Sequence, residues 1–388
     1  MNTITKVGVA IISLWLLCCN RESRRIVNND VAHQEKIAKG IVVDKDTFNI
    51  SHDFLRVQDT LHQRFFPGAK WAKVAPSALG WKIKELEAAK AFYEQLNADA
   101  CMIVQHGYVI AAWGDVTKPI PCRSIRKSFL GSLIGMYQGK GMIDLEKTLK
   151  SMDIDEKTHL TETERKATIR NLVSSRSGIF LPAAYDPNDH PARGTYKPGE
   201  VWHYNNWDFN VLLTVFEKET GRKIFEAFQE ELAEPLQMQD FNIRNTEYVY
   251  EDVSLHPAYL FKTSARDDAR LGLLWLNEGR WRDTQIIPAS WMKQSTALQT
   301  DFKGTSDLVL RDGYGYLFWV DKDKNNEVVG FSALGASGQF IYVNHKYDVV
   351  IVLRADPGSI FKKWLGLRLD PKESYALVDR VLNAVPEN

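Results

Sequence analysis

The spacing of hydrophobic positions changes along the chain, and each change predicts a different element. In GWKIKELEAAKAFYEQLNA (residues 80–98) apolar side chains recur every three or four positions, the period of an amphipathic helix. ACMIVQHGYVIAAWG (100–114) contains two apolar runs separated by His106-Gly107, which predicts a β-hairpin. A broad apolar stripe then begins after residue 124 and ends at the glycines of QGKG (138–141). This stripe predicts a largely buried helix.

The second half of the chain has a different pattern. Residues 145–250 alternate helical patterns with loops marked by Pro and Gly, and contain few strand signals. Runs of β-branched and aromatic residues return at 314–321, 338–344 and 348–356, and residues 372–385 have the pattern of an amphipathic helix. We therefore expect a fold of helices and strands in which a helical block lies at roughly 145–250 and an antiparallel sheet is completed late in the chain.

The N-terminus departs from this globular pattern. Residues 1–19 carry one lysine and then an apolar run too short for a spanning helix, which needs roughly 20 residues. LWLLCC resembles a bacterial lipoprotein signal, with Cys19 as the lipidated residue. That resemblance implies a protein anchored by lipid in the bacterial cell envelope. Plain secretion and an uncleaved anchor are the alternatives. Residues 20–75 are polar and predict a tether before a domain at 76–388.

Composition and charge exclude several classes of partner and cofactor. Lys plus Arg and Asp plus Glu both number 49, so no net positive field recruits nucleic acid. No Cys-x-x-Cys or His-x-x-x-His spacing is present, and neither a metal nor a cofactor is expected. If this signal is processed, only Cys101 and Cys122 remain in the mature domain, and we expect two buried free thiols rather than a disulfide.

The candidate chemistry begins with Ser124 and Lys127. The spacing i, i+3 at the start of an apolar helix places both side chains on one face, and the helix N-terminus favours developing negative charge. A lysine removed from water loses its preference for the charged form and can accept the serine's proton. The other Ser-x-x-Lys matches, at Ser290 and Ser359, have no such helix after them, and Ser290 is expected to be a helix cap.

Two further segments fit the same chemistry. KPGEVWHYNNWDFNVLL (197–213) places Tyr204 and Asn206 after a Pro-Gly turn and before an apolar helix. A tyrosine beside a lysine can relay a proton, and an asparagine amide can orient both the lysine and a substrate carbonyl. GASGQFIYV (335–343) leads from a Gly-rich turn into a strand, where backbone N–H groups can stabilise an oxyanion. Its candidate binding residues are Ser337, Gly338 and Gln339.

These segments, in this order, resemble the penicillin-binding and class C β-lactamase superfamily of serine hydrolases. NLVSSRSGI (171–179), TSARDDARLGLLWLNEGRW (263–281) and YGYLFWV (314–320) also resemble recurring segments of that family. The resemblance covers residues 76–388 and implies an α/β (α+β) sandwich, with a mainly antiparallel sheet flanked by helices and a helical domain inserted at roughly 145–250. It also implies Ser124 as the acylated nucleophile, Lys127 as its base, Tyr204 as a proton relay and Asn206 as an orienting amide. The backbone N–H groups of Ser124 and Gln339 would form the oxyanion hole.

The chain departs from the β-lactamase pattern in its third motif. Ala336-Ser337-Gly338 stands where those enzymes have Lys-Thr-Gly, so the cation that contacts a substrate carboxylate is missing. This departure and the SSRSG segment look more like the esterase and 6-aminohexanoate-dimer hydrolase branches, which implies a small-molecule ester or linear amide substrate. A D-alanyl or D-amino-acid peptidase or β-lactamase is the enzymatic alternative, and a non-catalytic lipoprotein that binds cell-wall ligands is the alternative from another class.

Four aromatic residues and one loop have both a structural and a substrate-binding interpretation. Aromatic side chains belong more often to a core than to a pocket. The aromatic residues that could wall a substrate pocket are Trp202, Trp207, Tyr316 and Trp319. Arg176 and Ser177 are expected to support the loop near the site rather than to contact the substrate.

Overall fold

The computed structural model describes residues 64–387, except for residues 187–188, 303–311, 357 and 359–368. The predicted signal peptide with Cys19, most of the predicted tether and the match at Ser359 lie outside the described residues. The part of the chain that the structure describes contains no helix long and apolar enough to cross a membrane.

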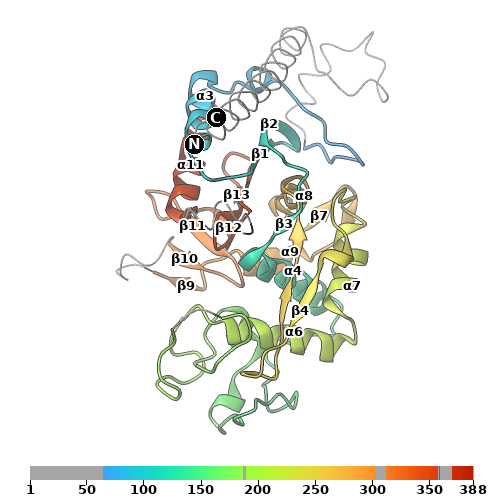
Figure 1. Cartoon of the computed structure of the whole chain (residues 1–388), viewed down its shortest axis with the longest axis vertical. Helices are drawn as coiled ribbons and strands as arrows, with labels where there is room; N and C mark the ends of the chain where they lie inside the picture. The colour runs from blue at the N-terminus through green and yellow to red at the C-terminus, as the bar shows by residue number, and fades with distance from the viewer. Residues whose placement is uncertain (1–63, 187–188, 303–311, 357, 359–368, 388) are drawn as a thin grey trace, which may run out of the picture.

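An antiparallel sheet of eight strands lies at the centre of the molecule, in the order β2-β1-β14-β13-β12-β11-β10-β9 (Figure 1). The hairpin of β1 and β2 joins the late strands through the antiparallel β1–β14 pair. The strands are β1 (Ala100–Gln105), β2 (Tyr108–Gly114), β9 (Thr300–Asp301), β10 (Gly313–Tyr314), β11 (Trp319–Lys322), β12 (Val328–Gly335), β13 (Gln339–Asn344) and β14 (Val349–Arg354). The predicted α/β fold with a mainly antiparallel sheet is confirmed.

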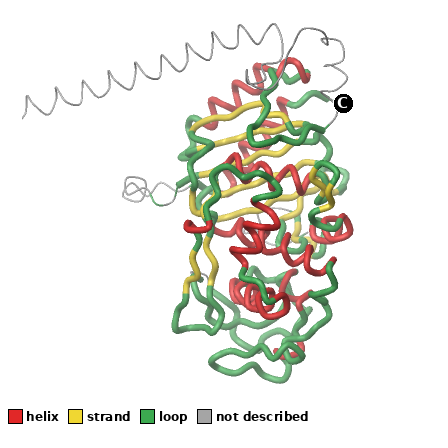
Figure 2. The backbone as a smooth tube through the Cα atoms, turned by 90° about the vertical axis from the view of Figure 1, so that its right-hand side faces the viewer, coloured by secondary structure: helices red, strands yellow, loops and turns green. Residues whose placement is uncertain are grey.

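Helices cover both faces of this sheet (Figures 1 and 2). α3 (Ile83–Tyr93) and α11 (Pro371–Ala384) pack on one face, and α4 (Arg126–Gly139) and α8 (Ala265–Leu276) lie on the other. Side chains of β1 pack into the hydrophobic cores on both faces of the sheet, because neighbouring side chains of a strand point to opposite faces. Cys101 and Ile103 belong to the core under α3 and α11, whereas Met102 and Val104 belong to the larger core.

The predicted helical segment at 145–250 contains short helices joined by long loops. Its main helix is α6 (Asn206–Thr220), which begins at the N-cap Asn205 and ends at Gly221 in a left-handed conformation.

The remaining helices and paired strands of the described residues, from all parts of the chain, are α5 (Ile169–Val173), α7 (Ile224–Phe228), α9 (Ala289–Ser295), β3 (Ile120–Pro121) with β6 (Lys262–Thr263), β4 (Glu247–Val249) with β5 (Ala258–Leu260), and β7 (Arg280–Trp281) with β8 (Thr284–Gln285). Short 3₁₀ or π turns cover Pro76–Leu79, Arg123–Ile125, Glu164–Lys166, Gln229–Ala233 and Ile243–Asn245.

Residues 64–75 pack along the folded domain, ahead of the expected boundary at residue 76. The backbone N–H of Val74 donates to Val109 O at 3.1 Å, and that of Val109 donates to Ala72 O at 2.9 Å, so this segment lies beside the edge strand β2. At the β1–β2 turn a Cβ on Gly107 would lie 1.7 Å from Phe65 O. Only glycine fits there, and its φ of +83° is also a conformation that glycine tolerates.

Several local predictions can be compared with the structure. The helices expected at 80–98 and 372–385 and the hairpin at 100–114 are present. Cys101 and Cys122 are buried and free, as expected. The single strand expected at 314–321 is two strands, β10 and β11, and β12 was not predicted, because VVGFSALG carries two glycines and a serine.

The expected helix cap at Ser290 is wrong. Pro288 is the N-cap residue of α9, and Ser290 is an exposed residue inside the helix.

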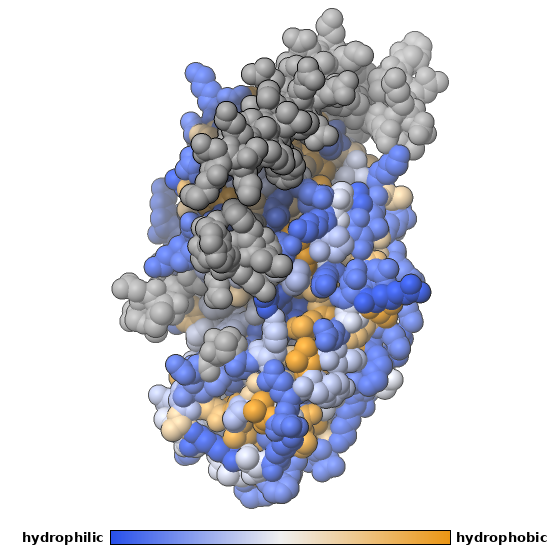
Figure 3. Space-filling view, viewed as in Figure 1, coloured by the Kyte–Doolittle hydropathy of each residue, from blue (hydrophilic) through white to orange (hydrophobic). Residues whose placement is uncertain are grey.

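On the face drawn in Figure 3, hydrophilic residues cover most of the described surface and hydrophobic residues come between them in small groups.

Candidate active site

Ser124 lies in a 3₁₀ turn, Arg123–Ile125, that leads directly into α4. The residue before it, Arg123, has a φ of +51°, a left-handed conformation that is uncommon for a residue with a side chain. Every residue of α4 from Arg126 to Tyr137 is buried, as the apolar stripe predicts. The turn therefore holds a half-buried serine at the start of a helix that is enclosed by the core.

Lys127 makes three hydrogen bonds that bring the predicted residues together. Its Nζ lies 2.9 Å from Ser124 Oγ, 2.6 Å from Tyr204 OH and 2.6 Å from Asn206 Oδ1. Burial lowers the pKa of Lys127 well below its usual value; the neighbouring charge of Arg126 lowers it further, and Asp186 opposes the shift. Because the pKa is lowered, the neutral amine is populated closer to physiological pH and can accept a proton.

Tyr204 and Asn206 are positioned by the start of α6. Asn205 caps the helix by accepting from the Trp207 N–H at 3.2 Å, and its own amide donates to Ile179 O at 2.7 Å. Burial raises the pKa of Tyr204 to about 12, so its hydroxyl keeps its proton at neutral pH. The two partners of Ser124 thus have pKa values shifted in opposite directions, a pattern that separates a proton acceptor from a proton donor.

Asp186 adds a carboxylate to this cluster. The Nδ2 of Asn206 donates to Asp186 Oδ1 at 2.8 Å, which turns the amide oxygen of Asn206 toward Lys127. The second oxygen of Asp186 lies 2.7 Å from His190 Nε2, and His190 in turn lies 3.3 Å from His203. Sequence reasoning missed Asp186, because the stretch AAYDPND (183–189) has only the composition of a loop.

The late glycine-rich segment reaches the site through the end of β12. A Cβ on Gly335 would lie 2.9 Å from both Ser124 N and Cys122 O, so this glycine permits the close approach of the two backbones. Ser337 and Gly338 lie in the turn between β12 and β13, where a Cβ on Gly338 would meet Leu369. The Gln339 side chain accepts from Arg354 Nε at 2.8 Å. Gly335 is the first residue of the glycine-rich segment at 335–343 that the sequence predicts to contribute to the site.

The four candidate pocket aromatics separate into two groups. Trp207 and Tyr316 are core residues: the Trp207 indole donates to Glu156 at 3.0 Å, and Tyr316 OH accepts from Arg170 at 2.6 Å. Trp319 stacks on Tyr204 with ring centroids 5.8 Å apart, and Trp202 packs against Trp319 at 5.9 Å. These two half-buried indoles therefore form an aromatic wall beside Tyr204.

Other residues considered from the sequence have structural partners. Arg176 donates to Gly199 O at 2.6 Å and to Thr300 Oγ1 at 3.2 Å, and Ser177 donates to Asp208 at 2.5 Å, so both brace the loop as expected.

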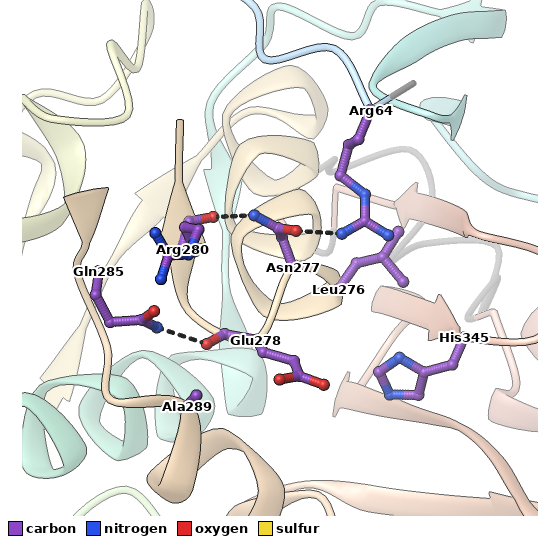
Figure 4. A pocket seen from close by; sticks show the side chains of 8 residues that line it. All are labelled: Arg64, Leu276, Asn277, Glu278, Arg280, Gln285, Ala289 and His345. Carbon is purple, nitrogen blue, oxygen red and sulfur yellow. Dashed lines mark hydrogen bonds between the residues drawn. The ribbon is translucent and has the colours of Figure 1, made fainter. Parts of the chain in front are cut away.

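An open polar pocket lies at the end of α8 (Figure 4). In it Asn277 donates to Arg280 O at 2.7 Å and Gln285 donates to Glu278 O at 2.8 Å. None of its lining residues is one of the residues around Ser124. In the part of the chain that the structure describes, no cluster of His, Cys, Asp and Glu side chains is arranged to hold a metal ion.

The geometry around Ser124 supports activation of a hydroxyl group. A buried amine with a lowered pKa contacts the serine, a protonated phenol contacts the amine, and the turn lies at a helix N-terminus that favours developing negative charge. With the antiparallel sheet and its flanking helices, these features define the class of penicillin-binding and β-lactamase-like serine hydrolases.

Comparison with known proteins specifies the family. The Beta-lactamase family model matches residues 89–356, and the chain belongs to this family. A Bacillus anthracis protein assigned as a 6-aminohexanoate-dimer hydrolase is 21% identical, with a TM-score of 0.57 over 77% of this chain and 83% of that chain. A penicillin-binding protein from Bacillus halodurans is 13% identical, with a TM-score of 0.57 over 75% and 99%.

An octameric penicillin-binding protein homologue from Pyrococcus abyssi is 17% identical, with a TM-score of 0.53 over 75% of this chain and 78% of that chain. At these identities the structural likeness establishes the fold. No curated protein matches the sequence.

Proposed function

We propose that the protein is a serine hydrolase that cleaves ester or linear amide bonds through an acyl-enzyme on Ser124. The observation that carries the proposal is the position of Lys127, whose buried amine lies within hydrogen-bond distance of Ser124, Tyr204 and Asn206. The lowered pKa of Lys127 and the raised pKa of Tyr204 support a base and a proton donor, respectively.

In the proposed reaction, Ser124 Oγ attacks the substrate carbonyl carbon while its proton passes to Lys127. The tetrahedral oxyanion is stabilised by backbone N–H groups at Ser124 and at the start of β13, for which Gln339 is the candidate. The bond to the leaving alcohol or amine then breaks, and the leaving group receives a proton through Tyr204. Water attacks the acyl-enzyme, the acid is released and the proton returns to Ser124 Oγ.

The proposed preference for esters and neutral amides follows from the cations around the site. Ala336 is exposed and offers no charge, and Arg176 is bound to Gly199 and Thr300. Arg126, beside Lys127, is 2% exposed and does not face solvent. A substrate carboxylate, as in a β-lactam or a D-alanyl peptide, would therefore have no evident cationic partner among these residues.

A substrate screen of the purified protein tests this proposal. p-Nitrophenyl esters and linear amides should be hydrolysed faster than nitrocefin or D-amino-acid peptides, and a fluorophosphonate should label Ser124. Efficient nitrocefin turnover would favour the β-lactamase alternative. Absence of labelling and of turnover on all substrates would favour a non-catalytic binding protein.

We also propose that the protein is held in the bacterial cell envelope by a lipid on Cys19. The support is the sequence LWLLCC after a short apolar run. A fatty-acid analogue should label the wild-type protein but not the Cys19→Ala variant, and only the wild type should partition into detergent. Unlabelled protein in the medium of wild-type cells would indicate secretion instead.

A further inference from the structure

Arg126 is a buried cation next to the active-site residues. It is 2% exposed, and its guanidinium lies between the rings of Tyr185 and Tyr259, at 5.6 and 5.3 Å from their centroids. Its Nε is buried without a hydrogen-bond partner, and no carboxylate of the described residues forms an ion pair with it. Burying a charge without a counter-ion is costly, and such an arrangement in a folded protein calls for a compensating role.

The guanidinium is attached to the turn that carries Ser124. Its Nη1 donates to Arg123 O at 2.7 Å, and Arg123 is the residue with the left-handed φ of +51°. Arg123 itself donates to the hydroxyl of Tyr185, the same residue whose ring contacts Arg126. This pair of contacts fixes a strained residue directly before the serine, where a change of conformation would move both Ser124 Oγ and its N–H.

The charge of Arg126 also acts on the predicted base. Arg126 is the neighbour of Lys127 in sequence, and its positive charge disfavours a second positive charge on the amine. The other titratable or charged groups that face Lys127 come from two other segments: Asp186, whose charge acts in the opposite direction, and Tyr204, whose hydroxyl stays protonated. Tyr259, from β5, contacts Arg126, whose guanidinium lies 5.3 Å from the centre of the Tyr259 ring.

We propose that Arg126 is a positioning residue of the active site, which holds the turn that presents Ser124 and keeps a fixed positive charge beside the Lys127 amine. This inference rests on the proposed function, because it assumes that Lys127 activates Ser124. It extends that function by assigning to this chain's Ser-x-Arg-Lys sequence a task that the spacing of serine and lysine alone does not require.

The test measures the rate of Ser124 phosphonylation by a fluorophosphonate as a function of pH, which needs no knowledge of the natural substrate. In Arg126→Gln the lost charge should raise the midpoint of the rising, acid side of the profile, because Lys127 holds its proton to higher pH. The rate at pH 7 should fall about ten- to hundredfold and recover partly at alkaline pH. Asp186→Asn should move the midpoint in the opposite direction.

Two further variants separate charge from structure. Arg126→Lys keeps the charge but cannot reproduce the guanidinium's contact, so it should label more slowly with the wild-type midpoint. It also carries the test if Arg126→Gln is insoluble; an upward-shifted midpoint in Arg126→Lys would overturn the proposal. Arg176→Gln, which removes an arginine that braces the neighbouring loop, is the matched control and should leave the midpoint unchanged.

The outcomes distinguish this inference from the proposed function. A wild-type protein that is not labelled, or that is labelled equally after Ser124→Ala, contradicts the proposed function itself. A wild type that is labelled at Ser124, with the same midpoint in Arg126→Gln, contradicts only the role of Arg126. A uniform loss of rate at every pH in that variant would also reduce Arg126 to a purely structural residue and refute the charge effect.

Discussion

Two arginines are buried near Ser124, and their surroundings differ in one respect. Arg354, at the end of β14, is fully buried and ion-paired with Asp268. Its three nitrogens also donate to Gln339 at 2.8 Å, Thr263 at 2.9 Å and Ile120 O at 2.5 Å. Arg126 has one carbonyl partner at 2.7 Å and an unpaired Nε. One guanidinium is completely satisfied and the other is not.

This difference indicates what each cluster contributes. A buried ion pair with all its hydrogen bonds made is specified by the fold, and losing one partner is mainly a loss of stability. In the other cluster the buried charge of Arg126 stands beside the Lys127 amine, whose pKa is lowered by burial and by that charge, and Asp186 opposes the shift. Unbalanced buried charge of this kind is typical of sites that use a shifted pKa. We therefore expect Arg354 to contribute mainly to stability and the proposed catalytic residues around Lys127 mainly to activity.

The largest effect is expected at Ser124. Ser124→Ala should reduce turnover about 10³- to 10⁶-fold, because it removes the oxygen atom that is proposed to form the acyl-enzyme. The melting temperature should stay close to that of the wild type, since the half-buried side chain loses only its hydroxyl. Turnover and thermal unfolding of the same preparation check both parts. Turnover that survives in Ser124→Ala would show that Ser124 is not the nucleophile, and the expected contrast with Arg354 would not hold.

Substitutions of Lys127 should show most clearly that activity and stability respond in opposite directions. Lys127→Arg and Lys127→Met should lose about 10²- to 10⁴-fold in activity, because neither side chain can accept the serine's proton. Lys127→Met should also unfold at a higher temperature than the wild type, because burial of an amine that water would charge is costly. Activity assays and calorimetry would show this opposition; a less stable methionine variant would contradict it.

The same lysine predicts how stability depends on pH. The folded pKa of Lys127 is lowered by burial, so between that pKa and the unfolded value of about 10.4 the unfolded chain binds more protons than the folded one. The free energy of unfolding should therefore gain a contribution that rises with pH through this window. Lys127→Met should lack that contribution, which denaturant unfolding at several pH values can measure.

The Arg354 cluster should behave in the opposite way. Asp268→Asn leaves Arg354 charged and without its counter-ion, and should cost about 3–5 kcal/mol of unfolding free energy. Turnover per folded molecule should change far less than in the Lys127 variants, because no hydrogen bond among the described residues joins Asp268 or Arg354 to Ser124, Lys127 or Tyr204. Denaturant unfolding and active-site titration check these outcomes. A collapse of turnover with unchanged stability would reverse the comparison.

The sequence could identify the residues that local patterns determine. Ser124, Lys127, Tyr204 and Asn206 stand at the starts of two apolar helices, α4 and α6, and helix starts carry recognisable signals. The structure brings these four side chains together through Lys127. Their catalytic roles remain predictions.

The residues that sequence reasoning missed depend on tertiary contacts. Asp186 lies in a loop whose composition predicts only a turn, and its meaning comes from Asn206, 20 positions later. The sequence predicts a Gly-rich segment that begins at Gly335, but it does not indicate that the backbone of Gly335 meets Ser124 N. Arg126 reads as a charged residue on an apolar helix, and the sequence does not indicate that Tyr185 and Tyr259 enclose it. Such long-range partners have no local periodicity.

The smallest predicted effect concerns the choice of substrate, and it uses the same difference between satisfied and exposed cations. A substrate carboxylate needs an accessible positive charge, and such a pair contributes about 1.5–3 kcal/mol, or about tenfold to over a hundredfold in rate. Arg126 is enclosed and Arg176 is occupied by Gly199, so neither supplies that charge. Ala336→Lys places a cation at an exposed turn position directly after Gly335, the residue that faces Ser124 N.

In this variant β-lactam acylation should increase about tenfold or more relative to ester hydrolysis. Ala336→Gln, which has a long side chain without the charge, is the matched control and should leave the ratio near that of the wild type. The ratio of nitrocefin to p-nitrophenyl acetate rates measures the effect directly. If lysine and glutamine change the ratio equally, side-chain length rather than charge governs substrate choice. Rapid nitrocefin hydrolysis by the unmodified protein would indicate that an existing cation already contacts the substrate carboxylate. The interpretation of Arg126 as an enclosed charge that does not reach the substrate would then be wrong.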